Sequence, residues 1–162
     1  MTRHFVLALT VGLALAGTAS AQNAAQISKT RGGASCSGCN LFQANLSGIE
    51  MTGRSFAKAR LRQADLSLAV MNRTSFAGAD LRDVDGYGGV FSGANFAGAD
   101  LTNATFVGAY LQGANFRGAR LSGVNFSGAE LQGAAVSQAQ LNSACGDVAT
   151  RLPGGFKIPP CR

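Results

Sequence analysis

The chain has 162 residues, with 22 Gly, no Trp, 46% apolar residues and 7% aromatic residues. This length allows one domain, and this composition excludes an ordinary mixed core in favour of a narrow interior of small side chains. The formal charge is +6, but the sequence has no basic run and no aromatic interleaving in a nucleic-acid motif, so we expect no nucleic-acid partner.

Residues 1–21 have the pattern of a secretory signal. A basic start with Arg3 precedes an apolar run over 5–16, and an Ala-Ser-Ala end predicts cleavage near Ala21. The apolar run is too short to serve as a membrane anchor. We therefore expect a periplasmic or secreted mature protein with no stable membrane insertion. Removal of Arg3 leaves 13 basic and 8 acidic residues, a formal charge of +5.

A flexible N-terminal segment is expected over 22–35, and a regular repeat follows it. From Leu41 to Leu141 a large apolar residue stands at every fifth position, except at Gly86, and Ala usually stands two residues earlier. We call these fifth positions centres. Successive centres would lie about 140° apart on an α-helix, and an odd period makes a strand alternate its faces. A chain that turns regularly fits better, because the Gly common two residues after a centre accepts the positive φ of a type II turn.

The centres form uniform columns when every fourth one is stacked, as in a square coil. The Leu column contains Leu41, Leu61, Leu81, Leu101, Leu121 and Leu141. The Phe column contains Phe56, Phe76, Phe96 and Phe116, and ends in Val136. A fifteen-residue coil would mix these residue types and fits worse, whereas a ten-residue period stays open.

The repeat unit resembles that of the pentapeptide-repeat proteins. Ala64-Asp65-Leu66 and Ala99-Asp100-Leu101 have the Ala-Asp/Asn-Leu spelling of that family, and the resemblance covers about 39–144. It implies an all-β fold, a right-handed quadrilateral β-helix over 36–144 with about five coils. The centres and the preceding Ala would point inward. The resemblance implies little about activity, since the functions of the family are diverse.

On this fold the four cysteines lie at the two ends of the stack. Five coils separate the ends, which is beyond disulfide reach, so we predict that Cys36 pairs with Cys39 and Cys145 with Cys161. The second bond would close a C-terminal cap over 145–162. A redox-active C-x-x-C centre is the alternative at the first pair. A metal site is not predicted, because two further ligands are missing nearby.

The clearest break in the repeat is 83–90, where Gly86 takes a centre. We interpret it as a structural irregularity. Asp83 and Asp85 resemble the start of a calcium loop, but the later ligands of that loop are absent, so a cation site is the weaker alternative.

Stacking the coils also predicts an apolar stripe on the outward side between the centres Leu66 and Met71. Its members are Leu68, Val70, Tyr87, Val90, Val107 and Tyr110. Glu50 and Glu130 give the stripe polar ends. Such stripes often mark association surfaces, although single exposed apolar residues are ordinary.

Charged residues stack as well. Arg60, Asp80, Asp100 and Arg120 share one outward column, in which opposite charges would meet at both outer steps. Lys58, Arg62, Arg73 and Arg82 make the early coils basic, which we interpret as a solvated surface, with an anionic partner as the alternative.

These features favour an exported, non-enzymatic scaffold or protein–protein interaction module, with no cofactor and with a protein partner or self-association. An enzyme is disfavoured because the predicted mature chain has no His, no nucleophile constellation and no phosphate loop. Thiol–disulfide redox activity is one alternative. The family resemblance implies another, imitation of DNA to bind topoisomerases, but that needs an acidic face and a cytoplasmic address, and this chain is basic with a predicted signal.

Overall fold

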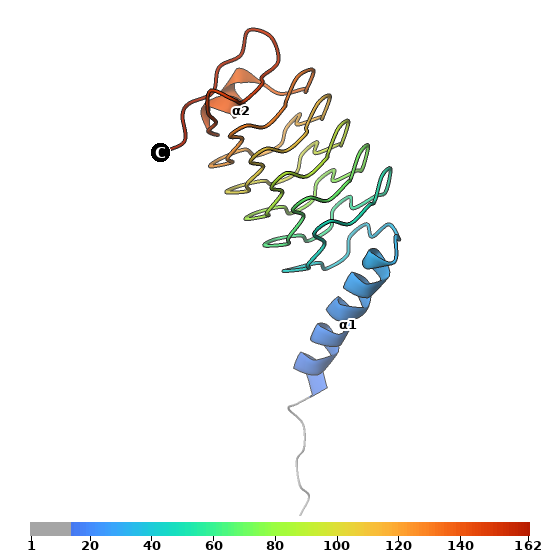
Figure 1. Cartoon of the computed structure of the whole chain (residues 1–162). Helices are drawn as coiled ribbons and strands as arrows, with labels where there is room; N and C mark the ends of the chain where they lie inside the picture. The colour runs from blue at the N-terminus through green and yellow to red at the C-terminus, as the bar shows by residue number, and fades with distance from the viewer. Residues whose placement is uncertain (1–13) are drawn as a thin grey trace, which may run out of the picture.

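The computed structural model describes residues 14–162, with two helices, α1 (Ala14–Arg31) and α2 (Gln138–Asn142). Between them the chain winds into a stack of coils, with α1 at one end and α2 at the other (Figure 1). The first thirteen residues of the predicted signal lie outside the described part. Neither described helix combines the length and the apolar character that a bilayer span requires.

Parallel backbone bridges set the period of the coils. Each joins residues twenty positions apart, from Asn40 with Arg60 to Asn125 with Cys145. Twenty residues make four sides of five, which decides against the ten-residue and fifteen-residue periods. The chain turns after each bridge, so the β-structure of residues 14–162 consists of single-residue bridges rather than extended strands.

Hydrogen bonds run along the stack in both directions at every side. The N–H of Leu101 donates to Arg120 O of the following coil at 3.0 Å, and the N–H of Asp100 donates to Ala79 O of the preceding coil at 3.0 Å. Within the turn, Ala104 N donates to Leu101 O at 2.9 Å. The third turn position has positive φ whether it holds Gly or another residue, for example 66° at Gly98 and 60° at Asn103, as a type II turn requires.

The core contains the two columns that the repeat predicts. Every Leu of the Leu column is at most 2% exposed. The Phe rings stack on one another, with centroids 5.6, 5.1 and 5.1 Å apart from Phe56 through Phe76 and Phe96 to Phe116. Ring planes 14°, 5° and 4° apart show that one rotamer repeats along the column.

The N-terminal end of the stack is covered by a helix, which corrects the expectation of a flexible segment over 22–35. Ile27 of α1 packs on the core. Gln26 Oε1 accepts a hydrogen bond from Asn40 N at 2.7 Å, and Arg31 donates to Asn45 O at 2.8 Å. The side chains of α1 thus satisfy backbone groups on the open edge of the first coil, which has no preceding coil to pair with.

The C-terminal end also departs from the repeat, which was expected to continue to 144. Ser137 caps α2 in a capping box with Gln140, so a short helix forms where a turn was expected. Position 138 holds Gln instead of the usual Gly, which favours this change. After α2 the chain returns in register, since Asn125 bridges Cys145, and it then gains one residue before Glu130 bridges Arg151.

Candidate functional site

The predicted apolar stripe lies on one side of the stack. Bridges place Val70 beside Val90, and Val90 beside Tyr110. The neighbouring outward residues are joined in the same way, since Leu68 N donates to Tyr87 O at 2.8 Å, and Gly88 N donates to Val107 O at 2.9 Å. Residues spread over 43 positions of sequence therefore form one continuous patch.

Three members of the stripe expose most of its apolar surface. The exposed fractions are 60% for Leu68, 55% for Tyr87 and 46% for Tyr110. Leu68 lies across Gly88, because its Cδ2 is only 3.0 Å from where a Cβ at Gly88 would stand. A side chain at residue 88 would push Leu68 away, so the glycine allows the leucine to fill the space between two coils.

Acidic residues border the stripe along the same column. Glu50 bridges Val70 at one end, and Glu130 bridges Tyr110 at the other. Glu130 also accepts a hydrogen bond from the side-chain amide of Gln112, which holds its carboxylate in place. The surface therefore has an apolar middle with one glutamate at each end, and Arg151 follows Glu130 in the column.

An apolar groove at the C-terminal cap extends this surface, and the repeat pattern does not predict it. Ser127 continues the column of Tyr87 and Val107, because Gly108 N donates to Ser127 O at 2.8 Å. Ser127 also lines a groove of about 450 Å³ together with Val148, Ile158 and Pro160. These cap residues lie outside the repeat, so no column could predict their position.

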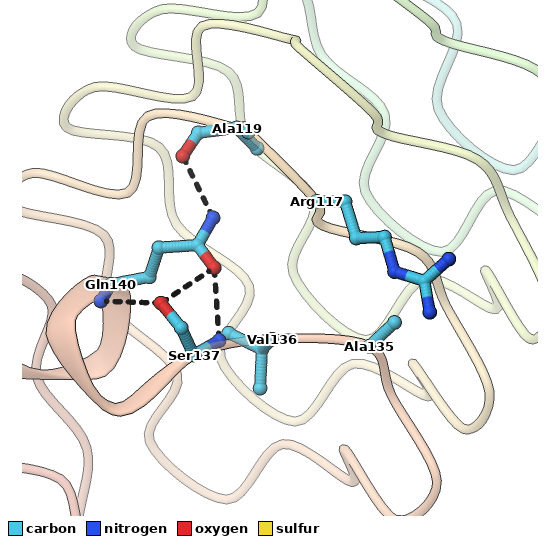
Figure 2. A pocket seen from close by; sticks show the side chains of 7 residues that line it. Arg117, Ala119, Ala135, Val136, Ser137 and Gln140 are labelled. Atoms are coloured by element: carbon cyan, nitrogen blue, oxygen red, sulfur yellow. Dashed lines mark hydrogen bonds between the residues drawn. The ribbon is translucent and has the colours of Figure 1, made fainter.

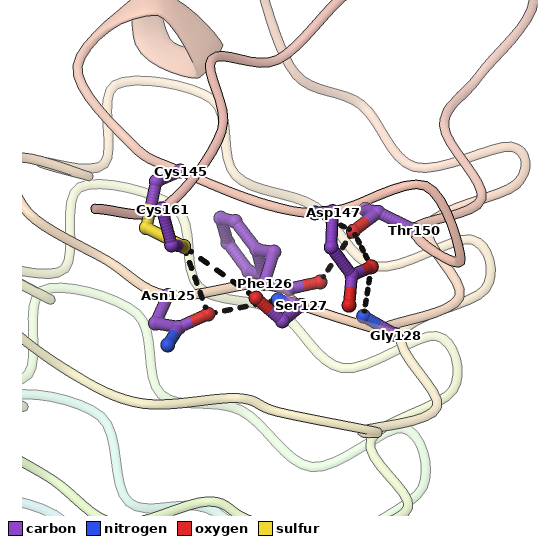
Figure 3. Close-up of a disulfide and its surroundings, with 8 residues drawn as sticks. All are labelled: Asn125, Phe126, Ser127, Gly128, Cys145, Asp147, Thr150 and Cys161. Carbon is purple, nitrogen blue, oxygen red and sulfur yellow. Dashed lines mark hydrogen bonds between the residues drawn. A yellow bond between two sulfur atoms is a disulfide. The ribbon is translucent and has the colours of Figure 1, made fainter.

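The groove is held in place by the cap disulfide and by Asp147 (Figure 3). Cys145 and Cys161, the predicted pair, are bonded with their Cα atoms 4.8 Å apart. Asp147 Oδ1 accepts hydrogen bonds from Gly128 N at 2.8 Å and from Ala149 N at 3.0 Å. The hydrogen bond from Gly128 is the main cause that lowers the pKa of Asp147 below its ordinary value.

A second opening lies beside α2 (Figure 2). Arg117 stands on one side of this groove of about 570 Å³, and Gln140 on the other. The Gln140 amide donates to Phe116 O at 2.6 Å and to Ala119 O at 2.9 Å. In a regular coil the N–H of residue 140 would pair with Ala119 O, so the Gln140 side chain replaces this backbone partner, and we assign the groove to the end of the stack.

The irregularity at 83–90 has a packing cause. A Cβ at Gly86 would lie 2.6 Å from Phe106 Cε1, and a Cβ at Gly89 would lie 2.4 Å from Phe91 Cε2. The two glycines make room for two Phe rings that are fully buried. The centre at Gly86 is therefore filled by Phe106 of the next coil.

The two aspartates of this segment have protein partners. Asp85 Oδ1 accepts a hydrogen bond from Tyr87 N at 2.9 Å, and Asp83 Oδ2 lies 3.5 Å from Arg62 Nε. Among the residues of the described chain, no three His, Cys, Asp or Glu side chains gather where they could hold a metal ion.

The charged column adopts different pairs from the predicted ones. The bridges do place Arg60, Asp80, Asp100 and Arg120 in sequence. Asp80, however, pairs with Arg82 of its own coil, with Arg82 Nε 2.7 Å from Oδ1 and an outer nitrogen 2.6 Å from Oδ2. An arginine two residues away can offer both donors of its fork, and these hydrogen bonds lower the pKa of Asp80.

The other cysteine pair closes the first coil. Cys36 and Cys39 are bonded, as predicted, with their Cα atoms 5.4 Å apart. Cys36 is 4% exposed and belongs to the hydrophobic core. Its sulfur is therefore shielded, whereas a redox cysteine needs an accessible thiolate.

Family models described as pentapeptide repeats match residues 34–72, 55–85 and 91–135. The chain belongs to the pentapeptide-repeat family, and this membership implies a right-handed β-helix.

Solved structures of similar proteins include HetL from Nostoc sp. strain PCC 7120, involved in heterocyst differentiation regulation. It is 27% identical, with a TM-score of 0.34 over 76% of this chain, which spans 64% of the HetL chain. A pentapeptide-repeat protein from the Arabidopsis thaliana thylakoid lumen is 26% identical, with a TM-score of 0.33 over 72% and 70% of the two chains. QnrB1, a plasmid-mediated fluoroquinolone resistance protein, is 24% identical, with a TM-score of 0.38 over 75% and 76%. No curated protein matches the sequence.

Proposed function

We propose that this protein is an exported, non-enzymatic scaffold, a β-helix of about five coils that binds another protein through the apolar stripe. One observation carries the proposal: six apolar outward residues from three successive coils adjoin one another, and Leu68, Tyr87 and Tyr110 are each about half exposed. Tyrosine is enriched in protein interfaces, and the buried centre of an interface is more apolar than the rest of the surface.

The charges at the ends of the stripe favour a different protein over a second copy of this chain. A two-fold pairing of antiparallel stacks centred on Val90 would set Glu50 of one copy against Glu130 of the other. A pairing of parallel stacks would set each glutamate against its own equivalent. Like charges facing each other oppose association. A partner protein with an apolar centre and basic flanks would avoid the repulsion between glutamates that arises in both pairings.

The cap groove lengthens the contact that such a partner can make. Val148 is fully exposed at this groove, and Ser127 joins it to Val107 along one column. We therefore include the groove in the proposed interface. A segment of the partner with apolar side chains would run from Tyr87 toward Pro160.

Two other functions receive less support. Burial of Cys36 argues against a C-x-x-C redox enzyme, because the attacking sulfur must be reached by its substrate. The formal charge of +6 argues against imitation of the polyanion DNA.

Site-specific photocrosslinking in the producing cells tests the interface. A photoreactive side chain at Tyr110 should give an adduct with another protein, and adding Leu68→Glu should remove it. The same group at Ser122, an exposed residue of another side, is the matched control and should give no such adduct. Adducts of equal yield at both positions, or an adduct with the mass of two copies of this chain, would contradict the proposal.

Export is tested separately by N-terminal sequencing of protein recovered from outside the cytoplasm. The expected first residue is Gln22. A chain that keeps Met1 and stays in the cytoplasm would refute the export part of the proposal.

A further inference from the structure

A groove with three arginines lies on a different side of the stack from the apolar stripe. It has a volume of about 260 Å³ and is lined by Asn40, Phe42, Arg60, Arg62, Asp80 and Arg82. Bridges place Arg60 between Asn40 and Asp80. The twenty-residue period likewise places Arg62 between Phe42 and Arg82.

Only one of the three arginines is fully paired. Both carboxylate oxygens of Asp80 are taken by Arg82. Arg62 reaches Asp83 through Nε alone, at 3.5 Å, and its side chain is 47% exposed. Its two outer nitrogens remain available to a ligand.

Arg60 is the second available cation. Within residues 23–162 its guanidinium forms no salt bridge and no hydrogen bond, because Asp80, its neighbour in the column, is turned toward Arg82. Arg60 and Arg62 are two residues apart on one side, so both can reach the same groove. Because these two arginines stand on one coil and both line the groove, their free guanidinium donors are concentrated there.

We infer that this groove is a binding site for a phosphomonoester with an apolar substituent, held by Arg60 and Arg62 with the substituent on Phe42. Arginine offers planar pairs of donors that match phosphate oxygens. The groups that line the groove carry a net charge of +2, which Asp83, the partner of Arg62, reduces to +1. A phosphomonoester is anionic near pH 7 and offers three acceptor oxygens, enough for both guanidinium groups, whereas a carboxylate offers two.

The shape of the groove supports a substituted phosphate over the free ion. Its volume is several times the share of about 30 Å³ that a water molecule has in the liquid. Phe42 is 40% exposed at its rim. An apolar group next to the phosphate can cover this ring, and that contact is missing with inorganic phosphate.

Calorimetric titration of the purified chain with phenyl phosphate tests the inference. We expect phenyl phosphate to bind more tightly than inorganic phosphate or benzoate, and Arg60→Gln to weaken it about tenfold, as for the loss of a charge-assisted hydrogen bond. Arg73→Gln, an exposed arginine on another side, is the matched control and should leave binding unchanged. Arg62→Gln provides a second variant, and circular dichroism confirms that each variant is folded.

Asp80→Asn gives a test in the opposite direction. It keeps the hydrogen-bond acceptor for Arg82 N but removes the only negative charge of the groove, so we expect several-fold tighter binding of phenyl phosphate. Asp65→Asn is the charge-matched control. Equal effects of the two substitutions would show that only overall charge matters, and would overturn the site.

The source of the phosphate group is distinguished with vesicles of phosphatidylcholine, with and without phosphatidic acid. Sedimentation with the phosphatidic acid vesicles that Arg60→Gln abolishes would identify a lipid headgroup. Binding of phenyl phosphate alone would identify a soluble ester. The inference fails if neither probe binds, if benzoate binds as tightly as phenyl phosphate, or if Arg73→Gln weakens binding as much as Arg60→Gln.

Discussion

Adding a single methyl group at Gly86 should destabilise this protein. The new Cβ would lie 2.6 and 2.7 Å from ring atoms of Phe106 and 3.2 Å from Thr105 O. Phe106 cannot easily move, because it is fully buried and its ring meets Phe91 edge-on, with centroids 5.5 Å apart. Gly86 does not have a positive φ, so the expected effect comes from packing and not from backbone strain.

The size of the effect follows from two opposing contributions. Overpacking a buried site costs about 1–3 kcal/mol. Replacing Gly by Ala also restricts the unfolded chain, which stabilises the folded protein by about 0.4–1 kcal/mol. The clash is the larger contribution, so Gly86→Ala should lower the free energy of unfolding by on the order of 1 to 2 kcal/mol. For a domain of this size, we expect a fall in Tm of about 2–8 °C.

Thermal and urea unfolding of a double-mutant cycle would measure this effect. Gly86→Ala should cost much less in a Phe106→Leu background, where the ring is gone, and the difference gives the coupling between the two sites. The repeat pattern alone predicts the reverse, since a larger residue at Gly86 would restore a missing centre. An unchanged or raised Tm for Gly86→Ala would show that Phe106 does not fill this space.

Three further substitutions test the stack and its cap. Leu101→Ala should lower the free energy of unfolding by about 2–5 kcal/mol, because neighbouring coils cannot close the void; a melt that hardly moves would contradict the stacked core. Cys161→Ser opens a loop with a sequence separation of 16 and should cost about 3 kcal/mol, which urea unfolding would detect. Asp147→Asn should destabilise the protein at neutral pH. Since the folded pKa of Asp147 is lowered, its contribution is present above the unfolded pKa of about 3.9 and is lost as the pH falls through the folded pKa. Wild-type and variant melts should therefore converge in acid, and a difference that persists there would contradict this assignment.

The interior of the stack could be predicted because each coil repeats the environment of the last. The residues of the Leu column occupy equivalent positions, and the same holds for the Phe column from Phe56 to Phe116. Uniform columns favour a period of twenty residues over fifteen, and the bridges of the structure decide against ten. Gly86 is the exception, because Phe106 of the neighbouring coil fills the space at this centre. Only the packing between coils reveals this.

The outward surface could be predicted only in part. Backbone register alone places Val70, Val90 and Tyr110 side by side, so the apolar stripe could be predicted from the sequence. The partner of Asp80 was not, because its carboxylate could reach either Arg60 on the adjoining coil or Arg82 on its own. The fork of Arg82 offers two hydrogen bonds, and this local geometry decides the pairing that leaves Arg60 available.

The two ends were the least predictable parts, for a common physical reason. A coil at the end of the stack has backbone groups that no neighbouring coil can pair. The repeat pattern does not predict which residues satisfy them. Gln26 at one end and Gln140 at the other supply side-chain amide groups in place of the missing backbone. Each helix presents its glutamine to the open edge, so α1 and α2 perform the same task although their sequences have no repeat in common. Both helices therefore act as stops, whereas the groove that lengthens the apolar stripe is formed by the cap segment that follows α2.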